Sequence, residues 1–373
     1  MTQLQFACPC LFGLESVVAA ECGRLGGGEV RSENGRVLFT GDVDTLARVN
    51  LGARVAERVL LVLARFHAQS FEELFQGVKA APLEAFIGAE DAFPVKGWSL
   101  QSKLHSVPSC QSIIKKAAVE RLAAAYGRQR FAETGPVRQL QFSILKDEVT
   151  LLLDTSGEGL HKRGYRAEST LAPIKETLAA GMLEVARLRR DNLLIDPFCG
   201  SGTFLIEAAL RARNIAPGLG RRFSAEQWGD QYRLAFSRGR AEAMEAVDRQ
   251  SDFAAVGYDV DPAAVELTLS NARKAGVIGC IRAEQRDIAD FVLPEGKVTV
   301  MTNPPYGERL LDEKGAEALY RTMGRVFPAR PYTSYYVICP HERFESLFGR
   351  KADRRRKLYN GMLQCQMYMY FKW

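Results

Sequence analysis

Two short motifs hold the residues whose types and spacing could do chemistry. The first, DPFCGSGT at 196–203, places an acid, Asp196, ahead of a loop with two glycines. The second, NPPYG at 303–307, begins with Asn303. Glycines let a ligand come within contact distance of backbone N–H groups, and the acid can face a positive charge on that ligand. The first motif therefore predicts a binding loop, and the second predicts fixed oxygen acceptors.

The NPPYG residues suit an acceptor that is an amino group attached to a planar ring. The lone pair of such an amine is delocalised, so two acceptors that draw its hydrogens away help to free it. The side-chain oxygen of Asn303 and the backbone carbonyl of Pro304 fit this task, because proline commits the backbone to an extended shape. Tyr306 offers a ring on which a base can stack, and Gly307 leaves room. Taken alone, the motif could also be a proline-rich turn.

The glycine loop has three interpretations. An apolar run at 193–195 predicts a buried parallel strand before it, and the residues from Thr203 onward have helical spacing. A dinucleotide-binding loop needs a third glycine in G-x-G-x-x-G, and Leu205 occupies that position. The second interpretation is a small amino acid–nucleoside held by the loop, with Asp196 facing its ammonium group. The third is a tight turn without a ligand.

Further acids follow the predicted strands. A strand at 254–258 ends in Asp259, which could accept hydrogen bonds from both hydroxyls of a ribose. A third strand at 280–286 ends in Asp287, which could accept one from an adenine amino group. A fourth strand at 297–302 runs directly into the second motif. Because open α/β sheets bind ligands at the carboxyl ends of their strands, both motifs are expected in one crevice.

Composition sets the class of protein. The chain has 373 residues, which suggests two or three domains, and its 47% hydrophobic and 25% charged residues are ordinary for a soluble globular protein. No apolar run reaches membrane-spanning length, and no signal peptide is evident. The eight cysteines lack metal-site spacing, so we expect free thiols, no metal site and a cytoplasmic location.

The charge is uneven along the chain. Residues 156–373 carry 33 Lys and Arg against 27 Asp and Glu, which accounts for the whole net charge of +6. An excess of this kind indicates a polyanionic partner or simply a solvated surface. The segment HKRGYR at 161–166 is a candidate for phosphate contact and base stacking, with a solvated connector as the alternative.

Two small α+β units are predicted ahead of the binding loop. Residues 1–66 show strands and helices in alternation, with a flexible turn at 23–30, and 67–158 form a second unit that ends in a hairpin around Lys146-Asp147. The pattern predicts strands at 2–7, 36–40 and 58–66, helices at 13–25, 42–52 and 109–126, and, in a later insertion, a helix at 235–250. Neither unit holds a catalytic constellation.

The sequence resembles the THUMP-containing RNA guanine-N2 methyltransferases of the large-subunit rRNA type. The runs that carry the resemblance are HKRGYR, APIKETLAAGML, DPFCGSGTFLIEAA, GYDVDP and NPPYGERL, within 161–310. The resemblance implies an α/β fold: a ferredoxin-like unit at 1–66, a THUMP unit at 67–158, and a Rossmann-like methyltransferase domain at 159–373 that binds S-adenosylmethionine (SAM). Its seven-stranded sheet would have an antiparallel last strand, for which Asn360-Gly361 supplies a hairpin turn.

The resemblance also implies roles for individual residues. The cofactor would be held by Asp196, Pro197, Cys199, Gly200, Gly202, Thr203, Asp259 and Asp287. The target base would be held by Asn303, Pro304 and Tyr306, which are the predicted catalytic residues. RNA would be contacted by Lys103, Lys115 and Lys116 of the THUMP-like unit and by Lys162, Arg163 and Arg166 of HKRGYR.

The expected function is SAM-dependent methylation of the exocyclic N2 of a guanosine in RNA, with large-subunit (23S) rRNA as substrate. A base inside a helix could not reach the site, so it would be flipped out or lie in a loop. Guanine-N2 methylation of tRNA, adenine-N6 methylation of DNA and glutamine-N5 methylation of a protein remain as alternatives. A non-catalytic ribosome-assembly factor is another, and Leu205 argues against a nucleotide-dependent oxidoreductase.

Overall fold

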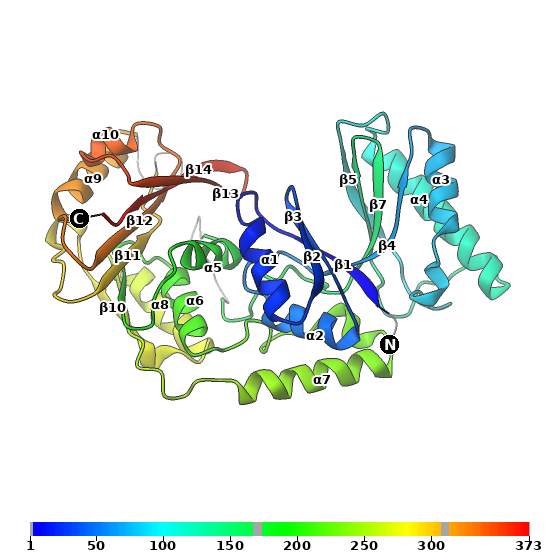
Figure 1. The fold of residues 1–373 in the computed structure, drawn as a ribbon, viewed down its shortest axis with the longest axis horizontal. Helices are drawn as coiled ribbons and strands as arrows, with labels where there is room; N and C mark the ends of the chain where they lie inside the picture. The colour runs from blue at the N-terminus through cyan, green and yellow to red at the C-terminus, as the bar shows by residue number, and fades with distance from the viewer. Residues whose placement is uncertain (1–2, 167–173, 307–312, 373) are drawn as a thin grey trace.

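The computed structural model describes residues 3–166, 174–306 and 313–372, which form an elongated molecule with a seven-stranded sheet toward each end (Figure 1). One hydrophobic core runs through all three predicted units, from Phe6 and Phe142 to Leu205. A second lies within the third unit and includes Val298, Tyr335 and Phe348. No helix in these described ranges combines the length and the apolar character that crossing a membrane requires.

The first sheet belongs to both N-terminal units, in the order β2-β3-β1-β4-β7-β6-β5. The strands are β1 (Leu4–Pro9), β2 (Gly28–Glu33), β3 (Arg36–Gly41), β4 (Leu60–His67), β5 (Val95–Leu100), β6 (Leu140–Leu145) and β7 (Glu148–Asp154). The helices are α1 (Glu15–Arg24), α2 (Val43–Gly52), α3 (Phe71–Ala80) and α4 (Val107–Tyr126). Strand β4 pairs with β1 at two residues and with β7 along its length, so it joins the ferredoxin-like unit to the THUMP unit.

Local sequence explains several of these elements. The side chain of Asp42 accepts a hydrogen bond from the backbone of Thr45 at 2.8 Å and caps α2. Lys146 and Asp147 both have positive φ, +53° and +66°, as a tight hairpin between β6 and β7 requires. The flexible turn predicted at 23–30 is wrong in its last residues, because β2 begins at Gly28. That strand lies at the sheet edge and buries no side chain, so its sequence lacks an apolar alternation.

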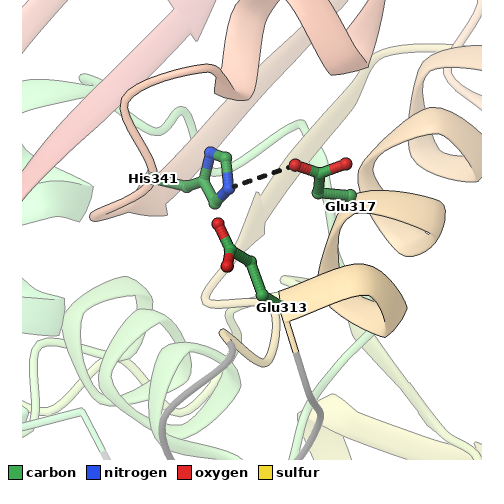
Figure 2. A group of neighbouring side chains, drawn as sticks. All are labelled: Glu313, Glu317 and His341. Carbon is green, nitrogen blue, oxygen red and sulfur yellow. Dashed lines mark ion pairs between the residues drawn. The ribbon is translucent and has the colours of Figure 1, made fainter.

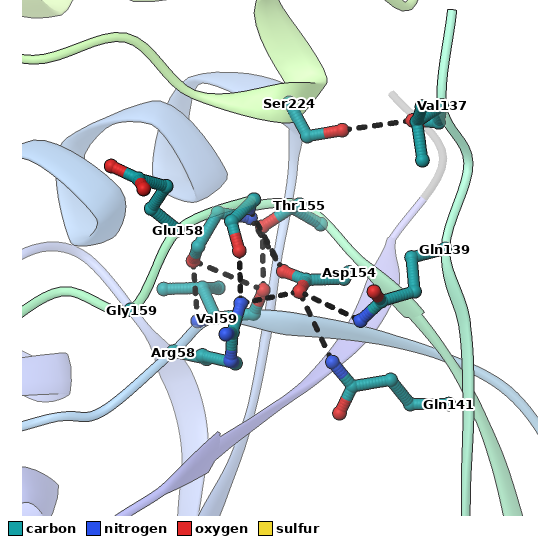
Figure 3. Close-up of polar contacts among 12 residues, drawn as sticks. Arg58, Val59, Val137, Gln139, Gln141, Asp154, Thr155, Glu158, Gly159 and Ser224 are labelled. Carbon is teal, nitrogen blue, oxygen red and sulfur yellow. Dashed lines mark hydrogen bonds and ion pairs between the residues drawn. The ribbon is translucent and has the colours of Figure 1, made fainter. Parts of the chain in front are cut away.

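A buried carboxylate fastens β4, β6 and β7 together. Asp154, at the end of β7, accepts hydrogen bonds from Arg58 at 2.5 Å, Gln141 at 3.1 Å and Gln139 at 3.4 Å (Figure 3). Burial raises the pKa of Asp154, and the guanidinium of Arg58 opposes that rise. Beside this cluster, the Ser224 hydroxyl donates to the Val137 carbonyl at 3.0 Å, which ties the later insertion to the THUMP unit (Figure 3).

The second sheet has the order β10-β9-β8-β11-β12-β14-β13. Its strands are β8 (Leu193–Asp196), β9 (Ala255–Asp259), β10 (Ile281–Gln285), β11 (Val298–Thr302), β12 (Thr333–Cys339), β13 (Arg354–Asn360) and β14 (Leu363–Tyr370). The first five are parallel, and β14 runs antiparallel to β12 and β13. This confirms the predicted fold and the hairpin predicted from Asn360-Gly361, although its two turn residues are Gly361 and Met362, because Asn360 ends β13 and pairs with Leu363. The strand order reverses between β8 and β11, which is where such sheets bind ligands.

The helices of this domain are α5 (Glu176–Val185), α6 (Thr203–Ala212), α7 (Asp230–Glu245), α8 (Pro262–Lys274), α9 (Glu313–Val326) and α10 (Phe344–Phe348). Helix α7 lies in the insertion and starts five residues earlier than the predicted 235–250. It runs beneath the ferredoxin-like unit and packs against α2, where Arg238 pairs with Asp44 at 2.5 Å (Figure 1). The insertion therefore connects the third domain to the first.

Candidate active site

Four polar residues lie at the carboxyl ends of four adjacent strands. Asp287 follows β10, Asp259 ends β9, Asp196 ends β8 and Asn303 follows β11, and these strands are neighbours in that order. The register supports this alignment, because Asp259 pairs with Gln285 of β10 and Asp196 pairs with Gly257 of β9. The two motifs therefore end on neighbouring strands at the same edge of the sheet, at its topological switch point.

Asp196 is the most deeply buried of these groups, with 2% of its surface exposed. Its carboxylate accepts hydrogen bonds from the Thr302 hydroxyl at 2.7 Å and the Phe198 backbone at 3.1 Å. Burial, with a smaller contribution from nearby Asp259, raises the pKa of Asp196 to about 7 against the effect of these two hydrogen bonds. A cation beside Asp196 would favour its ionised form, which suits the predicted contact with an ammonium group.

The glycine loop is held from below by groups on α8 and β9. The Gly200 N–H donates to Asp259 at 2.9 Å, and the Thr268 hydroxyl donates to the Gly200 carbonyl at 2.9 Å. The side chain of Asn271 donates to the Ser201 carbonyl at 3.0 Å. Thr268 and Asn271 were missed from the sequence. The only signal for them is their position on the buried face of the helix that follows Asp261.

The two loop glycines have different reasons to be glycine. Both have positive φ, +53° for Gly200 and +78° for Gly202. A Cβ on Gly200 would meet no atom within 4 Å, so its outer face is open to a ligand. A Cβ on Gly202 would come within 2.8 Å of Thr268, so this residue must be small for the loop to pack. The open face and the charged group behind it fit SAM, whose amino acid end is zwitterionic.

Pro197 and Cys199 lie beneath the loop. Both are buried, and the Cys199 thiol accepts a hydrogen bond from Thr268 at 3.5 Å. Burial raises the pKa of Cys199, so the thiol stays protonated. Asp287 is exposed and caps the short turn after it, accepting from Ala289 at 2.8 Å. The roles of these residues and of Asp259 in holding the cofactor stay predictions.

The NPPY turn is fixed from two sides. Tyr320 of α9 donates to the Pro305 carbonyl at 3.3 Å, and Asn360 of β13 donates to the Tyr306 hydroxyl at 3.0 Å. The side-chain oxygen of Asn303 is buried and accepts no hydrogen bond from any described residue. A buried acceptor of this kind normally has a partner, so it marks a place for an N–H donor. Gly307 lies outside the described residues.

The six residues predicted to contact RNA differ in their exposure and in their ion pairs. Lys103, Lys116 and Lys162 are exposed, with Lys162 paired to Glu158 at 2.9 Å. Lys115 does not match the prediction of a free phosphate contact, because its ammonium lies 2.5 Å from Glu133 inside the THUMP unit.

The position of Arg163 contradicts its predicted contact with RNA. It is 5% exposed, and its guanidinium pairs with Glu207 of α6 at 3.3 Å and donates to the Leu160 carbonyl at 2.5 Å. An RNA phosphate cannot reach it, so its role is to attach HKRGYR to α6. Arg166 also turns inward, toward Thr203 at the start of α6.

One group of described side chains has the composition of a metal site. Ligand atoms of Glu313, Glu317 and His341 lie within 4.8 Å of one another, where the first turns of α9 face the segment after β12 (Figure 2). The His341 Nδ1 accepts the Arg343 backbone N–H at 3.2 Å, so Nε2 of the neutral ring carries the proton and faces Glu317. Arg321 and Arg343 also pair with Glu317. These contacts indicate an ion-pair cluster that braces α9.

A cavity of about 590 Å³ lies away from this crevice, between α1, α2, α5 and α7. Its lining includes Arg24, Arg48 and Arg54, and none of its lining residues belongs to either motif. The chemistry of the two motifs therefore does not depend on it.

Three family models match the chain. The ferredoxin-like domain of RlmL matches residues 5–60, the THUMP domain matches 68–154, and the RMKL-like methyltransferase domain matches 163–369. The last match covers more than half of the chain and includes both motifs.

Individual relatives agree with these matches. YpsC of Bacillus subtilis, whose name assigns it provisionally to the RNA methyltransferases, is 41% identical over 96% of this chain and 94% of its own length. The ribosomal RNA large subunit methyltransferase K/L of Cellvibrio japonicus is 32% identical over 98% of this chain and 51% of its own length. The chain thus spans about half the length of the K/L relatives it matches.

A solved structure supplies the link to the cofactor. SMU.472, crystallised in complex with SAH, superposes with a TM-score of 0.93 at 40% sequence identity, over 100% of this chain and 99% of that one. SAH is what SAM becomes when its methyl group has been transferred. The chain belongs to the RMKL-like methyltransferase family, carries the RlmL-type ferredoxin-like and THUMP domains ahead of the catalytic domain, and uses SAM as methyl donor.

Proposed function

We propose that the protein methylates the exocyclic N2 of a guanosine in RNA, with large-subunit rRNA as substrate. The observation that carries the proposal is the buried side-chain oxygen of Asn303, which has no hydrogen-bond partner among the described residues and lies at the end of the strand next to the SAM loop. An N–H donor on the substrate satisfies that oxygen, and an exocyclic amine supplies one. The THUMP domain and the rRNA substrate named for the K/L relatives support RNA as the polymer that carries it.

The residues at the strand ends divide the work of holding the cofactor. SAM supplies a methyl group already activated as a sulfonium, so the protein has to position the reactants and exclude water. Asp196 faces the ammonium group, Asp259 accepts from the ribose hydroxyls and Asp287 accepts from the adenine amino group. Each oxygen of Asp259 already accepts one backbone N–H, from Gly200 or Asp261, and keeps a second lone pair for the ribose.

The NPPY residues act on the acceptor amine. Asn303 accepts one amine hydrogen through its side chain, and Pro304 accepts the other through its backbone carbonyl. The ring of Tyr306, held by Asn360, supports the base by stacking. No general base is required, because the methylated amine is acidic enough to lose its proton to water.

Exposed cations of the N-terminal and linking segments make the RNA surface in this proposal. Lys103 and Lys116 lie on the THUMP unit, and Lys162 lies in HKRGYR. Contacts of this type position the substrate and weaken with salt. A cytoplasmic location, where ribosomal RNA is available, is part of the proposal.

The test is a methyl-transfer assay with labelled SAM on rRNA, tRNA, DNA and release factor, together with mass spectrometry of nucleosides from a strain that lacks the protein. We expect label in large-subunit rRNA and loss of N2-methylguanosine from that rRNA in the strain. Loss from tRNA instead would assign the activity to tRNA, and label in DNA as N6-methyladenine would overturn the RNA assignment. No transfer to any substrate, with SAM still bound, would favour the assembly-factor alternative.

A further inference from the structure

Arg166 lies at the cofactor loop rather than on the RNA-facing surface. Its Nη2 donates to the Thr203 hydroxyl at 2.6 Å and to the Ile174 carbonyl at 3.3 Å, and Nη1 lies 3.5 Å from Glu176. Thr203 directly follows Gly202 and begins α6. We infer that Arg166 is a cofactor-binding residue that holds the carboxylate of SAM.

The hydrogen bonds of Arg166 leave one buried nitrogen, Nε, without a partner among the residues that the structure describes. Leaving a buried guanidinium N–H unpaired is costly, and a carboxylate is the acceptor that pairs most strongly with a charged guanidinium. The side chain is 14% exposed, so a ligand reaches it only through the edge that borders the loop.

Thr203 adds a second donor at the same place. Its Oγ1 accepts a hydrogen bond from Arg166, so its own hydroxyl proton is available to another acceptor. The Ser201 hydroxyl lies 3.3 Å away. The guanidinium of Arg166 and the hydroxyls of Thr203 and Ser201 therefore meet at the junction of the glycine loop and α6.

The position agrees with the chemistry of the ligand. The ammonium and carboxylate of SAM are attached to the same carbon, so placing the ammonium beside Asp196 brings the carboxylate to the same end of the loop. The adenosine end extends the other way, toward Asp259 at the end of β9 and Asp287 after β10. Of the three cations in HKRGYR, Arg166 is the one bonded to a residue of the cofactor loop; Arg163 pairs with Glu207 and Lys162 with Glu158.

The experiment compares SAM with decarboxylated SAM, which keeps the ammonium, sulfonium and adenosine but lacks the carboxylate. Affinities are measured by calorimetry on the full chain without RNA, for the wild type and for Arg166→Gln. We expect the wild type to prefer SAM, and Arg166→Gln to bind SAM about tenfold more weakly or worse, as loss of a charged hydrogen bond predicts. Affinity for decarboxylated SAM should change by less than about twofold, because the lost partner is absent.

Two further variants make the result specific. Arg189→Gln removes an exposed cation ahead of β8 that belongs to none of the sites described above, and it should leave both affinities unchanged. Arg166→Lys keeps the charge without the planar fork and should fall between the wild type and Arg166→Gln. Thermal melts check folding, because Arg166 also contacts Ile174 and Glu176. If Arg166→Gln does not fold, the affinities of Arg166→Lys for SAM and decarboxylated SAM test the inference instead.

Three outcomes would overturn the inference. Equal binding of the two ligands by the wild type would show that the carboxylate is not recognised. Equal weakening of both ligands by the Arg166 variants would show a structural brace. Weaker RNA binding with unchanged SAM affinity would return Arg166 to the RNA surface. The inference rests on the use of SAM and not on the methylated base, so it can fail or hold independently of the proposed function.

Discussion

In the proposed function, the chemistry depends most directly on Asn303. No described residue pairs with its side-chain oxygen, which lies just after β11, while the groups predicted to hold SAM lie at the carboxyl ends of β8, β9 and β10. We expect Asn303→Ala to abolish methyl transfer and to change the dissociation constant for SAM by no more than a few-fold. Single-turnover methyl transfer and calorimetry with SAM measure the two quantities separately. Transfer that survives in Asn303→Ala would contradict the amine-positioning role.

Asp196 should make SAM binding depend on pH. Burial raises its pKa to about 7 in the folded protein. Below that pH the group is protonated, and pairing with an ammonium requires the proton to leave, so affinity is full above pH 7 and falls as the pH drops. We expect the dissociation constant to rise by about tenfold per pH unit between pH 7 and 5.5, which corresponds to one released proton.

Asp196→Asn is the matched control for this titration. The amide has the same shape and does not ionise, so the variant should bind SAM more weakly at pH 7 and show a flat profile below it. Calorimetry in buffers of different ionisation enthalpy counts the released proton directly. A wild-type profile as flat as that of Asp196→Asn would show that Asp196 does not face the ammonium group.

The sequence predicted the positions of the crevice residues more accurately than the roles of the basic residues, and the reason is physical. Asp196 and Asn303 are placed by strand ends, which apolar runs and prolines mark in the sequence. Arg163 and Lys115 look like surface cations, but their carboxylate partners Glu207 and Glu133 are distant in the sequence. Only folding brings these pairs together, so the sequence predicted more RNA-contacting cations than the structure leaves unpaired with a carboxylate.

The glycine loop is the element whose conformation should respond most to substitution. Gly202→Ala combines a left-handed φ with a Cβ only 2.8 Å from Thr268 on α8. The φ alone costs ~1 kcal/mol, and the crowding adds another ~1–3 kcal/mol or shifts the loop. We therefore expect lower stability in urea denaturation and clearly weaker SAM binding.

Gly276→Ala is the control for the loop prediction. Gly276 has φ of +72°, close to that of Gly202, and its Cβ would meet no atom within 4 Å. It should cost ~1 kcal/mol of stability through φ alone and leave SAM affinity unchanged. Equal SAM affinities of the two variants would show that packing against α8 does not set the shape of the loop.

The elements themselves followed from the sequence where the signal was local. The turn at Lys146-Asp147 and the hairpin after Asn360 were predictable, because left-handed φ, as at Asp147 and Gly361, favours particular residue types. Strand β2 was not, because an exposed edge strand has no apolar face. Thr268 and Asn271 were missed because their targets are backbone carbonyls on another element.

At the scale of the whole molecule, the N-terminal units are one folded body rather than two. Strand β4 belongs to both, and the boundary placed between residues 66 and 67 stays a prediction that falls at the end of that shared strand. Because β4 joins β1 to β7, the two units should open together. Hydrogen-exchange mass spectrometry of the full chain should give β1, β4 and β7 the same opening free energy. Loss of protection in β7 at conditions where β1 stays protected would contradict this.

Asp154, the buried carboxylate that links β4, β6 and β7, allows the most direct test of what stabilises the two N-terminal units. Asp154 has a side chain 1% exposed, while Arg58 is 30% exposed, so part of their attraction is screened. Arg58→Ala leaves a buried carboxylate without its cation and should lower the free energy of unfolding by about 2 kcal/mol at pH 7. Because burial already raises the pKa of Asp154, this loss should grow as the pH rises and shrink in acid, where the group is neutral.

Adding Asp154→Asn to Arg58→Ala should recover most of that loss, because the neutral amide no longer needs the cation. Arg128→Ala, which breaks an exposed pair with Glu90 in the THUMP unit, should cost less than about 0.5 kcal/mol. Urea denaturation of the four proteins, wild type included, measures these differences. If Arg58→Ala cost no more than Arg128→Ala, the shared sheet would owe its cohesion to backbone pairing and apolar contacts alone, and Asp154 would be a tolerated buried acid rather than the group that joins the units.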